Sequence, residues 1–272
     1  MSERTSAFRT LWLSIFSLFL VYAVAGLLFS RLFHRIGSGL DPEFWDFAAY
    51  VGSFVVTIGY ACVLRRGRML EIPSFRPEKW KADPRVVLSG VVLMLAAGIV
   101  LTPLLERMPD TYAERLDAYM DGGFWPMFTA VVAAPLLEEF LFRGIVQKNF
   151  VNAFGPLTGI VVASLLFGAI HLIPQQVVYA TLLGLILGTV YCLTGSLLGS
   201  IAVHFVNNGL TVLLHMVFGR AGSVERRILG DGPWWDRICL LSVLLLAGGA
   251  WYAVRKLRRS AATPNGNDSA EN

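Results

Sequence analysis

Charged residues are missing from long stretches of this sequence. No Asp, Glu, Lys or Arg occurs in residues 149–219, a run of 71 residues, and four shorter runs are equally uncharged: 10–30, 47–64, 86–105 and 238–254. Soluble domains carry about 25% charged residues, whereas this chain has 15% charged and 55% hydrophobic residues. A membrane-spanning helix needs about 20 apolar residues, so the longest run must fold back on itself more than once. The chain is therefore predicted to be an integral membrane protein in contact with the lipid bilayer.

Two further features are scarce, namely strand-like alternation and paired cysteines. Only helices and closed barrels satisfy the backbone within lipid, and the apolar runs are too long and too uniform for barrel strands, so an all-α polytopic bundle is predicted. The three cysteines lie in separate apolar runs without a CxxC partner, and we interpret them as packing residues. The net charge of +4 does not indicate nucleic-acid binding, because the basic residues cluster beside apolar runs.

Glycine and proline divide the apolar sequence into about eight predicted spanning helices. Gly155-Pro156, Pro174 and Thr194-Gly195 are the expected breaks within the longest run, because proline lacks an N–H and glycine commonly ends helices. The predicted spans are residues 8–33, 44–64, 85–105, 124–147, 157–172, 176–193, 196–218 and 235–256.

The division of the chain follows from these spans. We distinguish an N-terminal three-span region (1–123), a core of spans four to seven (124–219), a last span with its loop (220–259) and a polar tail (260–272) that is predicted to be disordered. The charged segment 106–121 is interpreted as a solvated loop, with an interfacial helix as the alternative.

The distribution of basic residues predicts the orientation. With eight spans both termini share one side, and that side has 14 Lys and Arg against eight on the other. By the positive-inside rule both termini are expected to be cytoplasmic, in the plasma (inner) membrane if the source is bacterial. Residues 23–25 (Ala-Val-Ala) resemble a signal-peptidase site, but the apolar run continues beyond them, so an uncleaved first span is favoured.

Ionisable side chains gather in spans four, five and seven. Such residues are costly inside a membrane, by about 2.5–3.5 kcal/mol each, and indicate function by default. Glu139 and Arg143 are i,i+4 neighbours that can pair, which leaves Glu138, pointing elsewhere, as the candidate general base. His204 and Asn208 also share one helix face, and His171 comes from a third helix. A Glu–His pair can deprotonate water, and a His with an Asn can stabilise an oxyanion.

At these residues the sequence resembles the CAAX prenyl endopeptidase and bacteriocin-processing (CPBP, or Abi) family. The motifs are Glu138-Glu139-x-x-x-Arg143, Phe167-x-x-x-His171 and His204-x-x-x-Asn208, in order and each on its own predicted span. The resemblance implies an intramembrane endopeptidase in which Glu138 and His171 activate water. It also implies that Glu139 and Arg143 support the site, that His204 and Asn208 form the oxyanion hole, and that Phe167 packs the wall at which substrate binds. The implied partner is a peptide or lipidated protein substrate.

Metal dependence is open at this stage. Family members are often labelled metalloproteases, and Glu138, His171 and His204 could hold zinc with a water as fourth ligand. The sequence has no HExxH motif, however. We favour a glutamate-activated water without a metal.

Less specific interpretations stand beside these. Glu138, Glu139 and Arg143 could form a structural ion-pair cluster, His171 could be an ordinary interfacial residue, and Asn208 could join helices by hydrogen bonding. His215 is interpreted as packing or cavity lining, Asn207 as outside the shared face, and Gly184 with Gly188 as a close-packing stripe. The alternatives at the level of function are a catalytically silent membrane scaffold or regulator and an ion-coupled transporter.

Overall fold

In a computed structural model, residues 3–36, 41–73, 81–109, 111–219, 224–230 and 232–262 are described, and these residues contain helices but no β-strand. The helices are α1 Glu3–Ile36, α2 Pro42–Arg66, α3 Pro84–Leu105, α4 Thr111–Asp121, α5 Phe124–Phe128, η2 Thr129–Ala133, α6 Ala134–Glu139, η3 Phe140–Gln147, α7 Lys148–Phe154, α8 Pro156–Ala169, α9 Pro174–Thr194, α10 Leu197–Phe218, α11 Val224–Leu229 and α12 Pro233–Ala262. The all-α polytopic prediction is confirmed. Most of the predicted disordered tail, residues 263–272, lies outside the described residues.

The predicted count of about eight spans is not confirmed. Within the described residues, six helices are long and apolar enough to cross a membrane, and these are α1, α2, α3, α9, α10 and α12. The predicted fourth span is instead a succession of short α- and π-helical segments from Phe124 to Phe154. The predicted fifth span, α8, has 14 residues, which is shorter than a full crossing requires.

The charged segment after α3 also differs from expectation. Residues 111–121 form the helix α4 rather than the solvated loop that was favoured. The helix contacts α5, and Asp117 on it lies 2.9 Å from Nε2 of His215 on α10. This packing stabilises a segment whose short length alone would leave it marginal as an isolated helix.

The predicted breaks between helices are confirmed. Gly155 has φ 84° between α7 and α8, and Gly195 has φ 66° at the end of α9; glycine takes such values at no steric cost. Pro156 and Pro174 stand in the first turn of α8 and α9, where a missing N–H does no harm. Ser196 then caps α10 by accepting a hydrogen bond from the N–H of Leu198.

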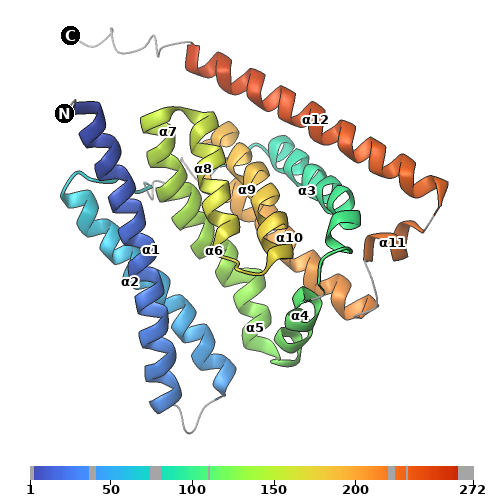
Figure 1. Cartoon of the computed structure of the whole chain (residues 1–272), viewed down its shortest axis with the longest axis horizontal. Coiled ribbons are helices and arrows are strands. Elements are labelled where there is room, and N and C mark those ends of the chain that lie inside the picture. The colour runs from blue at the N-terminus through green and yellow to red at the C-terminus, as the bar shows by residue number, and fades with distance from the viewer. Residues whose placement is uncertain are drawn as a thin grey trace.

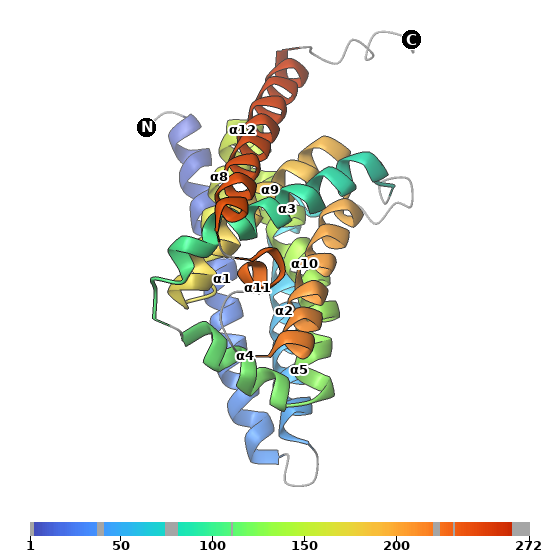
Figure 2. The same cartoon turned by 90° about the vertical axis from the view of Figure 1, so that its right-hand side faces the viewer.

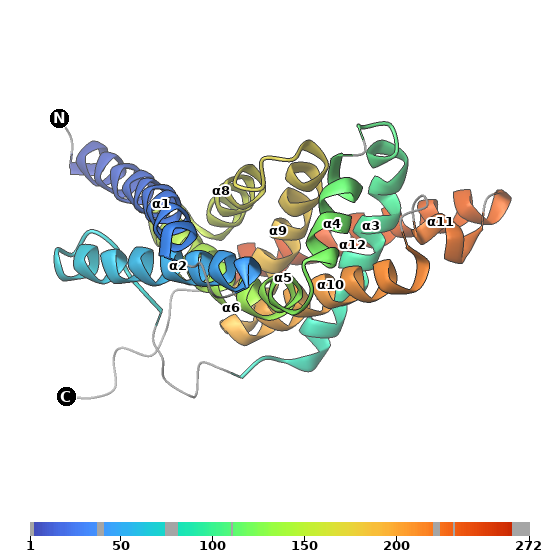
Figure 3. The same ribbon diagram turned by 90° about the horizontal axis from the view of Figure 1, so that it is seen from below.

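The broken helix from Phe124 to Phe154 runs through the middle of the bundle. Figure 1 shows the α1–α2 hairpin on one flank, with α8, α9, α10 and α3 beyond the central helix and α12 outermost against α3. Seen from below, α5 and α6 lie between α2 and α10 (Figure 3). In Figures 1 and 2 the start of α1 and the end of α12 lie at the same end of the molecule. A chain that crosses the membrane an even number of times has both termini on the same side, and this arrangement is consistent with that.

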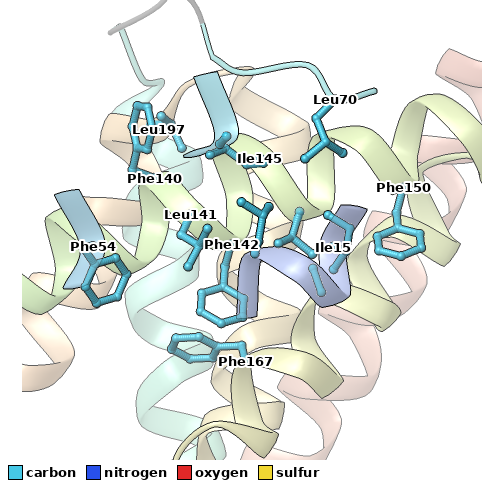
Figure 4. Packing of buried hydrophobic residues seen from close by; sticks show 14 of the residues in the cluster. Ile15, Phe54, Leu70, Phe140, Leu141, Phe142, Ile145, Phe150, Phe167 and Leu197 are labelled. Carbon is cyan, nitrogen blue, oxygen red and sulfur yellow. The ribbon is translucent and has the colours of Figure 1, made fainter. Parts of the chain in front are cut away.

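The core surrounds η3, and all eight of its residues are buried. Phe142 meets the ring of Phe167 edge-on at 5.1 Å, and Ile15 of α1 reaches the same layer (Figure 4). Gly184 and Gly188 lie where α9 closely approaches α8 and η3. A Cβ on Gly184 would lie 3.0 Å from Cα of Ser164, and a Cβ on Gly188 would lie 2.6 Å from Oε1 of Gln147. The interpretation of these glycines as packing positions is confirmed.

Candidate active site

The helix that carries the two glutamates departs from regular α-helical geometry on both sides of them. The π-helical segments η2 and η3 flank α6, and such segments are frequent at functional sites. In η2 the N–H of Ala134 donates to the carbonyl of Thr129, five residues back. The next residue in that register, Pro135, has no N–H for the carbonyl of Ala130. The side-chain amide of Asn208 donates to that carbonyl instead, at 2.7 Å.

Glu139 lies at the centre of a buried charge cluster. Its Oε1 accepts hydrogen bonds from Nη1 of Arg143 at 2.8 Å and from Nδ1 of His204 at 3.0 Å. The Arg143 and Glu139 side chains are 1% and 0% exposed, so the pair is shielded from solvent. The predicted i,i+4 pairing is therefore confirmed. Arg143 also donates to the carbonyl of Gly184 at 3.3 Å, which ties the cluster to α9.

Glu138 faces the other side of the same imidazole. Its Oε2 lies 3.9 Å from Nε2 of His204, and its Oε1 accepts a hydrogen bond from the hydroxyl of Tyr50 at 2.8 Å. The prediction that Glu138 points elsewhere than Glu139 is wrong in this respect. The two Cα positions diverge by about 100°, but the long side chains reach both nitrogens of a ring that enters between them.

For the neutral form of each histidine, the hydrogen bonds determine which ring nitrogen carries the proton. A backbone carbonyl and an Arg-paired carboxylate can only accept, so Nδ1 of His171 donates to the carbonyl of Phe167 at 2.8 Å, and Nδ1 of His204 donates to Glu139. In its neutral form, each ring then has its lone pair on Nε2. Holding one ring nitrogen in this way orients the other for proton transfer.

The ring of Phe167 joins these groups into one wall. His171 and His204 meet it edge-on, with centroids 5.1 Å and 5.7 Å away, and the guanidinium of Arg143 lies 4.5 Å above it. Phe167 is buried. Phe167 therefore packs against both histidines and Arg143, while its role as the wall at which substrate binds stays a prediction.

The pair Asn207 and Asn208 forms a small network beside the charge cluster. Asn207 accepts from the hydroxyl of Tyr179 at 2.6 Å and donates to Oδ1 of Asn208 at 2.9 Å. Asn207, which was expected to lie off the shared face, thus orients Asn208. One N–H of the Asn208 amide is used by Ala130, and its second N–H remains as the candidate donor to an oxyanion.

Comparison with known protein families gave a match to the part of the chain that contains most of these residues. A family model described as type II CAAX prenyl endopeptidase Rce1-like matches residues 121–210. This match covers about a third of the chain and supports the CAAX prenyl endopeptidase (CPBP) family for that segment. The match supports a peptidase at the level of the family, and the six long apolar helices of the described residues indicate an integral membrane protein. Comparisons with curated proteins and with solved structures gave no match.

The matched segment of this CAAX endopeptidase homologue contains the residues whose chemistry was predicted, on α6, η3, α8 and α10; His171, which was expected on a third helix, lies in the turn after α8. Glu138, Glu139, Arg143 and His204 form one connected cluster, and Phe167 places the ring of His171 at its edge. Asn208 lies four residues from His204 and faces η2. The structure thus brings the predicted residues to one region, with His171 less directly connected than expected.

The predicted metal ligands do not form a metal site. Within the described residues, which include Glu138, His171 and His204, no group of three or more His, Cys, Asp or Glu side chains is placed to hold a metal ion. Glu138 and His204 approach each other, but no hydrogen bond or ion pair joins His171 to either within the described residues. These three side chains therefore do not fit the zinc ligand set that was considered.

Sequence reasoning missed Tyr50, which lies on α2 outside the matched segment. A phenol in the middle of an apolar span was the available signal, because a buried hydroxyl normally finds a hydrogen-bond partner. It also missed the pair of His215 with Asp117, since the partner lies on α4, which was expected to be a loop.

Replacing Gly168 with alanine is expected to destabilise this membrane peptidase by about 1–3 kcal/mol and to reduce its activity. A Cβ there would lie 2.8 Å from the carbonyl of Val177 and would also clash with Thr181, which would push apart α8 and α9 next to Phe167. The matched control is Gly59→Ala on α2, where a Cβ meets nothing within 4 Å. Thermal melting in detergent should fall for Gly168→Ala and stay level or rise for Gly59→Ala; equal melting of both variants would contradict the packing account.

Proposed function

We propose that this chain is an intramembrane endopeptidase that hydrolyses a peptide bond of a membrane-associated or lipidated peptide, with Glu138 as the base that deprotonates water. The observation that carries the proposal is the approach of Glu138 to Nε2 of His204, at 3.9 Å, while Glu139 holds the opposite nitrogen of that ring. A carboxylate beside an oriented imidazole, within a low-dielectric protein interior, is the arrangement that general acid–base catalysis requires.

The proposed reaction adds one water across the amide. The water oxygen attacks the carbonyl carbon while Glu138 takes one water proton, which gives a tetrahedral oxyanion. Glu138 then passes that proton to the amide nitrogen, the carbon–nitrogen bond breaks, and the products are a carboxyl group and an amine. No other oxidant, reductant or co-reactant is needed.

The other residues have supporting roles in this proposal. His171 presents a lone pair at Nε2 that can accept a hydrogen bond from the attacking water. When protonated to an imidazolium, His204 would donate from Nε2 to the oxyanion. Glu139 lies beside its Nδ1 and Glu138 beside its Nε2, so both carboxylates favour this charged form. Asn208 would offer its second N–H to the same oxyanion, and Glu139 with Arg143 would keep His204 in place.

The substrate is proposed to reach the site from the bilayer or from the cytoplasmic face. The charge distribution along the chain favours cytoplasmic termini. The description of the matching family model names a CAAX prenyl endopeptidase, so a farnesylated peptide ending in three residues after the modified cysteine is the first probe to use.

Comparative membrane peptidomics tests the proposal in cells. Cells that express the wild-type chain are compared with cells that express Glu138→Gln, and with Glu114→Gln on the exposed face of α4 as the matched control. We expect at least one membrane-associated precursor to accumulate only with Glu138→Gln, along with loss of its cleaved product. Identical processing with all three chains would overturn the proposal.

A further inference from the structure

Tyr50 connects the N-terminal hairpin to the residue that does the proposed chemistry. It lies on α2, and its hydroxyl donates to Oε1 of Glu138 at 2.8 Å across 88 positions of sequence. The family match begins at residue 121, so neither that match nor the three sequence motifs includes this contact.

We propose that Tyr50 is a positioning residue for Glu138, a role that rests on the proposed function. Its hydroxyl occupies Oε1, so that the second oxygen, Oε2, is the one that faces His204. A carboxylate with one oxygen fixed by a short hydrogen bond loses rotational freedom about its terminal bond. The base is thereby held in the orientation in which Oε2 can receive a proton from water.

The need for such a donor follows from how the cations of the site are used. Arg143 makes its ion pair with Glu139. In the described part of the chain, the hydrogen-bond and ion-pair partners of Glu138 are the hydroxyl of Tyr50 and the ring of His204. Hydrogen bonds to a charged acceptor are about twice as strong as neutral ones, so the Tyr50 hydroxyl is a large part of what holds this carboxylate.

Packing fixes the ring of Tyr50 independently of its hydroxyl. The ring lies 5.0 Å from that of Phe54, which in turn meets Tyr22 of α1 at 4.9 Å. Phe54 is 1% exposed. A phenylalanine at position 50 would keep these contacts and lose only the oxygen, so the α1–α2 hairpin should remain docked.

The substitution Tyr50→Phe tests the proposal, with Tyr60→Phe as the matched control on the same helix. The hydroxyl of Tyr60 donates to Oγ of Ser17 at 3.2 Å, so the control also removes one part-buried hydrogen bond, but one remote from Glu138. With the purified full chain and a farnesylated peptide probe, we expect kcat to fall about ten-fold in Tyr50→Phe, the loss typical of one hydrogen bond to a charged group. We expect KM to change less than two-fold, and p-aminophenylalanine at position 50, which restores a donor, to recover most of kcat.

Modification of Glu138 by dicyclohexylcarbodiimide gives a second readout that needs no substrate. Freeing Oε1 from its donor should speed labelling of Glu138, measured by mass spectrometry, in Tyr50→Phe and leave it unchanged in Tyr60→Phe. Equal kcat and equal labelling in the two variants would overturn the positioning role. So would a loss of kcat in Tyr50→Phe that matches a loss of folded protein and is not recovered by p-aminophenylalanine. Failure of the proposed function is distinct, because Glu138→Gln would then cleave the probe as well as the wild type.

Discussion

Arg143→Leu is expected to destabilise the protein by about 3–5 kcal/mol, the cost of leaving one member of a buried ion pair without its partner. Arg143 is 0% exposed and pairs with Glu139 at 2.8 Å. The substitution would also remove the contact with the ring of Phe167 and the hydrogen bond to the carbonyl of Gly184. We expect a large drop in melting temperature in detergent, together with loss of cleavage.

The double variant Glu139→Gln/Arg143→Leu is the control for this effect. It removes both charges, yet the glutamine introduced at position 139 can still accept the hydrogen bond from Nδ1 of His204. If the buried unpaired carboxylate is what destabilises the single variant, the double variant should recover a large part of the lost melting temperature. A double variant that is as unstable as Arg143→Leu would show that side-chain packing, and not the unpaired charge, dominates.

Glu138→Gln is expected to lower the cleavage rate of the purified enzyme by about 10³-fold, within the range that general acid–base catalysis contributes. Glutamine has nearly the same shape and can still accept from the hydroxyl of Tyr50, but it cannot take a proton from water. The melting temperature should therefore change little. The measurement is single-turnover cleavage of the farnesylated probe, with wild type and Glu114→Gln alongside.

Two other outcomes of the Glu138→Gln experiment would contradict the role of Glu138 as the base. If Glu138→Gln retains more than a tenth of the wild-type rate, Glu138 is not the base. If it loses activity together with its folded structure, the role of Glu138 is structural, as in the ion-pair interpretation that the sequence also allowed.

Much of the fold could be read from the sequence because the membrane imposes simple rules. Uncharged runs gave the positions of the long helices, and Gly155, Pro174 and Gly195 gave the breaks between them. The number of spans was harder. The central segment from Phe124 to Phe154 changes between α- and π-helical geometry, and α8 is short. Neither property has a local signal as clear as hydrophobicity, since both depend on the tertiary contacts of the segment.

The site was predictable where its residues lie on one helix. The i,i+4 rule gave the pair of Glu139 and Arg143, which the structure confirms. It could not give contacts between helices, such as the insertion of His204 between two adjacent glutamates or the hydrogen bond from Tyr50. The side-chain amide of Asn208 donates a hydrogen bond to the carbonyl of Ala130. In π-helical geometry the backbone partner of that carbonyl would be Pro135, which has no N–H, and no spacing rule predicts this.

The central claim is that Glu138 and His204 act together in one reaction, Glu138 on the attacking water and His204 on the oxyanion that forms, and a double-mutant cycle tests it most directly. Single-turnover cleavage of the farnesylated probe is measured for wild type, Glu138→Gln, His204→Gln and the variant with both changes. Residues that act as a unit give strongly non-additive losses, so the double variant should be about as slow as the slower single variant. Losses that multiply, so that the double variant is slower by the product of the two single effects, would contradict a shared site.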